Sequence, residues 1–90
     1  MLTPTTNDAE ALALAAMAAT LSDERRARRF LDLTGLEVDE LRARAVAGDR
    51  SLLSATILFL ESHEPDLIAV AGAIGASPAQ LVAARGILEA

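Results

Sequence analysis

The sequence predicts an all-α protein, a compact bundle of five or six short helices with two helix–glycine–helix corners. Hydrophobic residues make up 52% of its 90 residues, but aromatic residues make up only 2%. Alanine and leucine therefore supply most of the apolar surface, and both favour helices, whereas the residue types that favour strands are scarce. Capping residues and glycines also divide the chain into short segments. We expect residues 7–90 to form a single helical domain after a disordered lead-in at residues 1–6.

The first two helices are delimited by capping residues and a glycine. Asn7 is suited to cap a first helix over about residues 8–20, whose many alanines would let a neighbouring helix approach closely. Ser22 is suited to cap a second helix, which carries four arginines on its exposed turns. Gly35 then ends that helix as its C′ residue.

The third and fourth helices differ in polarity. Residues 38–47 form a third helix that opens with acidic residues, closes with arginines and stops at Gly48. Asp49 or Ser51 caps the fourth helix, in which residues 52–60 are apolar nearly all round. Such a helix lies at the centre of a domain or at an interface. The same run could form a buried strand, but the sequence holds no second strand to pair with it.

The last two helices carry the clearest local signals. Pro65 suits the first turn of a fifth helix that runs to about residue 74, before Gly75 breaks the chain. Residues 77–80, Ser-Pro-Ala-Gln, form a capping box with proline at the first helical position. A sixth helix then reaches about residue 88.

The two glycine corners resemble each other. Residues 30–43 and 70–83 align at a spacing of forty residues, and Gly35 coincides with Gly75 in this alignment. Each segment is a helix, a glycine turn and a capped helix. An internal duplication would explain this similarity. The turn and capping residues that all helix-turn-helix corners share would explain it equally well, and both explanations stay open.

Several classes of function are disfavoured by composition. The chain has no cysteine, and its single histidine, His63, has no partner for metal ligation or for nucleophilic catalysis. We therefore expect no enzyme, no cofactor, no metal and no small-molecule ligand. A net charge of −5 argues against broad affinity for nucleic acid or anionic membranes. No apolar run near the start is long enough to span a bilayer, and the lack of cysteine fits a cytoplasmic protein.

A DNA-associated regulatory protein is the alternative hypothesis. Residues 67–88 resemble a DNA-binding helix-turn-helix motif around Gly75. The helix that would read DNA offers only one cation, Arg85, and residues 64–90 carry three acidic residues against that one arginine. A DNA reader gathers several cations there, so a structural corner is the favoured interpretation.

The leading hypothesis is a protein-interaction module or adaptor that acts through homodimer or partner contacts. The apolar content is high for so short a chain, and the fourth helix could present apolar residues to a partner. The four arginines of the second helix could contact an acidic partner, or they could form a solvated face of ion pairs, which is the simpler explanation. The candidate partner-binding residues are Arg25, Arg29, Phe59, Leu60 and His63.

Two motifs resemble those of a known family. The sequence FLDLTGL at residues 30–36 and the sequence FLESHEPDL at residues 59–67 are similar to those of a family of short alphaproteobacterial proteins of unknown function. The resemblance covers most of residues 10–88. It implies an all-helical bacterial cytoplasmic protein, and it supplies no site residues.

Overall fold

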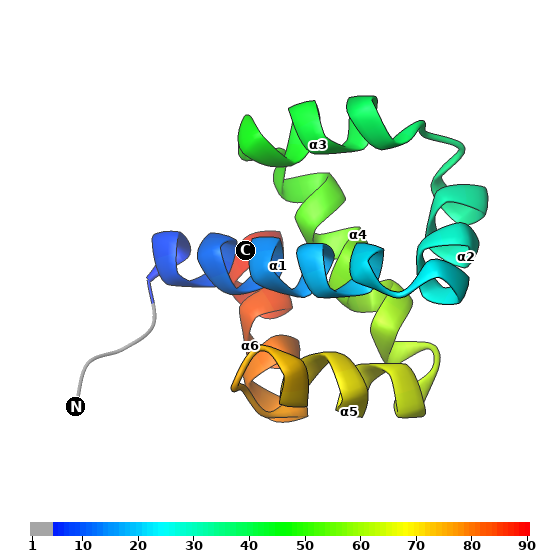
Figure 1. Ribbon diagram of the computed structural model, residues 1–90. Helices are drawn as coiled ribbons and strands as arrows, with labels where there is room; N and C mark the ends of the chain where they lie inside the picture. The colour runs from blue at the N-terminus through cyan, green and yellow to red at the C-terminus, as the bar shows by residue number, and fades with distance from the viewer. Residues whose placement is uncertain (1–4) are drawn as a thin grey trace.

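The computed structural model describes residues 5–90, which form six α-helices around one core and contain no strand (Figure 1). The prediction of an all-α bundle is confirmed. Residues 1–4, most of the expected disordered lead-in, lie outside the described residues. The helices are α1 (Thr6–Ser22), α2 (Glu24–Thr34), α3 (Val38–Val46), α4 (Arg50–Glu61), α5 (Glu64–Ala73) and α6 (Pro78–Glu89).

The first two helices begin at other residues than we expected. Thr5, not Asn7, caps α1: its hydroxyl accepts the backbone N–H of Asp8 at 3.1 Å, and the Asp8 carboxylate accepts the backbone N–H of Thr5 at 2.9 Å. This reciprocal capping box starts the helix two residues early. Asp23, not Ser22, caps α2 by accepting the backbone N–H of Arg26. Ser22 still belongs to α1, where its hydroxyl donates to the Ala19 carbonyl.

The other helix boundaries agree closely with the sequence. Asp49 caps α4 by accepting the backbone N–H of Leu52. Ser77 and Gln80 form the expected capping box at the start of α6, directly before Pro78. Helices α3, α5 and α6 each end within one residue of the expected position.

Helix α4 is the centre of the bundle, and it packs against α1, α3, α5 and α6 (Figure 1). Its Leu53, Ile57 and Leu60 side chains are fully buried. The two small residues Ala13 and Ala16 let α1 lie close against α4 and α6, because an alanine face keeps the backbones near each other. A helix that is apolar all round lies either at the centre of a domain or at an interface, and α4 lies at the centre.

Both glycine corners are present. Gly35 has a φ of 71° and Gly75 a φ of 70°, so both lie in the left-handed region. Helices often end at such a residue, and glycine adopts this conformation with little strain because it has no Cβ. The similarity between the two corners includes the burial of equivalent side chains. Phe30 and Val70 precede the two glycines by five residues, and both are fully buried; so are Leu41 and Leu81, which follow them by six.

Replacing Gly75 by alanine is expected to lower the free energy of unfolding by about 1 kcal/mol, because an L-residue is strained at this positive φ. A Cβ at Gly75 would meet no atom within 4 Å, so backbone strain is the main cost. Gly86 is the matched control: it lies inside α6, also with open space around it, and Gly86→Ala should stabilise by about 0.5–1 kcal/mol. Urea unfolding followed by circular dichroism measures both; changes of the same sign would contradict this account.

No single helix within residues 5–90 is long and apolar enough to cross a membrane. The pair α5 and α6 meets the length and composition criteria only when taken together, and these two helices are bent by 95° relative to each other.

Candidate functional site

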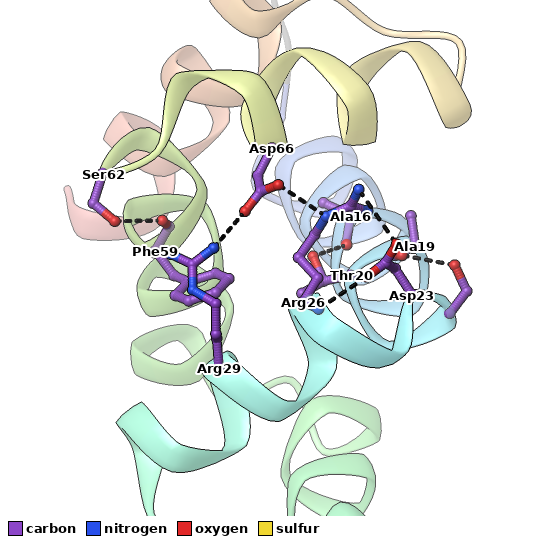
Figure 2. A network of polar contacts seen from close by, with 10 residues as sticks. Ala16, Ala19, Thr20, Asp23, Arg26, Arg29, Phe59, Ser62 and Asp66 are labelled. Atoms are coloured by element: carbon purple, nitrogen blue, oxygen red, sulfur yellow. Dashed lines mark hydrogen bonds and ion pairs between the residues drawn. The ribbon is translucent and has the colours of Figure 1, made fainter.

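A cluster of charged residues joins α2 to α5 (Figure 2). Asp66, in the first turn of α5, is only 8% exposed. Its carboxylate accepts hydrogen bonds from Arg26 Nε at 3.2 Å and from Arg29 Nη1 at 2.9 Å. The Arg29 guanidinium also lies 5.4 Å from the centroid of the Phe59 ring, close enough for a cation–π interaction. Two helices that are distant in sequence are thereby held together by one carboxylate.

The charges of this cluster are largely compensated within the chain. Asp23 adds a second carboxylate, 3.8 Å from Arg26. The backbone N–H of Arg26, followed by the positive charge of its side chain, holds the pKa of Asp23 below its usual value. A polar hollow of about 250 Å³ is lined by Asp23, Arg25, Arg26, Arg29 and Asp66. Since two of its three arginines already bind carboxylates, we interpret the cluster as a structural clamp.

The five candidate partner-binding residues do not form one exposed face. Leu60 is fully buried and Phe59 nearly so; Phe59 packs on Phe30 with ring centroids 5.0 Å apart. Both side chains belong to this chain's own core, because an apolar run in a central helix is covered by its neighbours. Arg29 is bound to Asp66. The structure thus places Arg29 and Phe59 in contact, but inside the clamp.

The two remaining candidates lie at separate positions. His63 is partly buried at the capping position of α5, where its side chain makes no capping hydrogen bond. Its backbone N–H donates to the carbonyl of Leu60 at 3.0 Å. Arg25 is exposed on α2 and makes no ion pair with any described residue. Of the five candidates, Arg25 alone is exposed and without an ion pair to a described residue.

The single arginine of the helix-turn-helix-like corner is engaged. Arg85 of α6 donates to both carboxylate oxygens of Glu61 on α4, and its Nη1 lies 2.8 Å from Glu89. Glu89 also accepts the hydroxyl of Ser54 at 2.9 Å. These hydrogen bonds, with that from Arg85 the largest cause, lower the pKa of Glu89, and the two carboxylates raise the pKa of Arg85. Arg85 therefore fastens α6 to α4.

An apolar groove is lined by residues of α1 and α3. Both of these helices lie across α4 (Figure 1). We call this hollow the α1–α3 groove; its cavity volume is about 330 Å³. Five lining residues come from α1 and three from α3: Leu14, Met17, Ala18, Leu21, Ser22, Arg42, Ala45 and Val46. A second hollow, on the α2 side, shares Leu21 and Ser22 with it. The two hollows therefore meet at the end of α1.

Two large apolar side chains border this groove from opposite sides and remain in solvent. Val46, at the end of α3, is 82% exposed, and Leu14 of α1 is 41% exposed. None of the five candidate partner-binding residues lines the groove. The one available signal was the stretch from Ala11 to Ser22, which carries no charge although part of it is exposed.

Within residues 5–90, no group of three or more histidine, aspartate or glutamate side chains could hold a metal ion. The fold and its groove define a small helical-bundle protein with an open apolar surface. The chain belongs to the family described as "Protein of unknown function (DUF3572)", which matches residues 6–90. No curated protein and no solved structure matches the chain significantly. The predicted membership in a family of unknown function is confirmed; the alphaproteobacterial origin stays a prediction.

Proposed function

We propose that this chain is a non-enzymatic protein-interaction module that binds a protein through the α1–α3 groove. The observation that carries this proposal is that Val46 and Leu14 border one apolar hollow and stay in water. A single exposed apolar side chain is ordinary on a protein surface, whereas a contiguous set beside a hollow is typical of a binding site. A partner that covers both side chains would remove their apolar surface from water, and this burial would favour binding.

A protein fits this surface better than a small molecule does. A ligand lying inside the 330 Å³ hollow would contact Val46 but leave much of this side chain, which is 82% exposed, in solvent. Small-molecule sites bury most of the ligand surface inside a cleft, and this groove is open along its length. A protein surface can cover the hollow and both bordering side chains at once.

The DNA-binding alternative gains no support from the second corner. Arg85 is its only cation, and its guanidinium is bound by Glu61 and Glu89. A phosphate would have to displace two carboxylates in order to reach this side chain. A cytoplasmic location is part of the proposal, because a chain without cysteine needs no disulfide bond and is compatible with a reducing compartment.

Site-specific photocrosslinking tests the proposed function. A photoreactive phenylalanine analogue replaces Val46 in the chain expressed in its native host, and the matched control carries it at Ala83, an exposed residue of α6. We expect a discrete protein adduct from position 46 and none from position 83, with mass spectrometry identifying the crosslinked chain. Adducts of equal yield at both positions, or none at either, would contradict the proposal.

A further inference from the structure

We infer that the occupant of the α1–α3 groove is an amphipathic helix of a partner protein, which places a carboxylate against Arg42. This inference rests on the proposed function and names the partner chemistry of the same site. Three features support it: the length of the groove, the helices that flank it, and the charge of its lining.

The groove has dimensions that suit a helix. Its α1 side is formed by Leu14, Met17, Ala18 and Leu21, which follow the i, i+3, i+4, i+7 pattern of one helix face. The distance from Leu14 to Leu21 along the helix is about 10 Å at 1.5 Å per residue, or two helical turns. Helix α3 forms the opposite side with Ala45 and Val46. A third helix can lay three or four apolar side chains between two such ridges.

Arg42 gives the groove its electrostatic preference. Among the described residues that line the groove it is the only charged one; it is exposed, and it makes no ion pair within residues 5–90. By contrast, Arg44 of the same helix binds Asp49 at 2.8 Å. The facing stretch of α1 from Ala11 to Ser22 is uncharged and offers Arg42 no counter-ion. A partner that covers Arg42 must supply a carboxylate, because a covered and unpaired charge is costly.

The same charge argues against a second copy of this chain as the occupant. A two-fold symmetric contact uses the same patch on both copies. Two such grooves facing each other would bring two Arg42 side chains into one interface, and no carboxylate lines either groove. Like charges that share a covered interface repel, and this repulsion selects against the pairing. An acidic amphipathic helix meets the apolar and the charged requirement together.

The test uses the purified chain and a displayed library of helical peptides of about 14 residues, which is four turns. Selection on the wild-type chain is compared with selection on a groove variant that combines Leu14→Glu with Val46→Glu. Both positions are exposed, so the variant should fold, which circular dichroism checks. We expect peptides enriched only on the wild-type chain to carry apolar residues at i, i+3 or i+4, and i+7, with aspartate or glutamate beside that stripe.

Binding of an enriched peptide is then measured by fluorescence anisotropy. Arg42→Glu should weaken its binding at least about tenfold, and changing the peptide's acidic residue to lysine should restore binding to this variant. Arg25→Glu is the matched control, because Arg25 is also exposed and without an ion pair to a described residue. Its substitution lies outside the groove and should change the affinity by less than about twofold.

The outcomes separate this inference from the proposed function. Groove-dependent peptides with no acidic preference, bound equally well by Arg42→Glu, would overturn the inference and leave the interaction module standing. A dimer detected by light scattering that Val46→Glu dissociates, with no peptide enriched, would make a second copy the occupant and also overturn the inference. If neither a peptide nor a second copy depends on the groove, and Val46 yields no crosslink, both proposals fail.

Discussion

The Leu60→Ala variant is expected to lose about 3–5 kcal/mol of unfolding free energy, the largest effect that we predict for a single substitution. Leu60 lies in the middle of the core on the central helix α4, and its side chain is fully buried. The substitution removes apolar surface from that core and leaves a cavity that the neighbouring helices refill only in part. A domain of this size has a total stability of roughly 5–13 kcal/mol, so the loss is a large fraction of it.

Leu58→Ala is the matched control for this variant. It changes the same residue type in the same helix, but Leu58 is 54% exposed, so the change should stay within about 0.5–1 kcal/mol. Urea unfolding at one temperature measures both variants. Equal destabilisation by the two substitutions would mean that Leu60 is not a core residue. That result would return Leu60 to the set of side chains available to a partner.

Local signals predicted most of the fold, because helix ends depend on residues next to one another. The box formed by Ser77 and Gln80 and the left-handed Gly35 act within one turn, so a reader of the sequence can locate them. The predicted N-caps of α1 and α2 were wrong because two residues near each helix start are able to cap it. Thr5 wins over Asn7 because Asp8 can return a hydrogen bond to it, and Asp23 wins over Ser22 because Ser22 is still inside α1.

The candidate site was harder to predict, because it depends on how whole helices are placed. A helix that is apolar all round is expected to be buried on every side, but its sequence does not tell whether the same chain or a partner buries it. The sequence therefore predicts Phe59 and Leu60 as partner-binding residues, whereas the structure buries both within this chain. The ion pair between Arg26 and Asp66 joins residues forty positions apart, beyond the reach of any helix periodicity. The exposure of Val46 depends on the space that α3 leaves beside α1. None of these features has a local sequence pattern.

The clamp between α2 and α5 should be the most sensitive polar contact of the fold. Asp66→Ala removes the acceptor of two charged hydrogen bonds and leaves Arg26, whose side chain is 18% exposed, with only its weaker contact to Asp23. Hydrogen bonds to charged groups contribute more than neutral ones, and loss of one partner of a shielded pair leaves the other uncompensated. We expect the free energy of unfolding to fall by about 2–3 kcal/mol.

An exposed aspartate of α2 provides the comparison for this clamp. Asp32→Ala removes the same carboxylate from a residue that makes no ion pair with a described residue, and it should change stability by less than about 0.5 kcal/mol. A double-mutant cycle between Arg26→Ala and Asp66→Ala then isolates their interaction, expected at about 1–2 kcal/mol. Because Asp66 is nearly buried, added salt should reduce this coupling only slightly. Additive effects of the two substitutions would show that the ion pair between Arg26 and Asp66 does not hold α2 against α5.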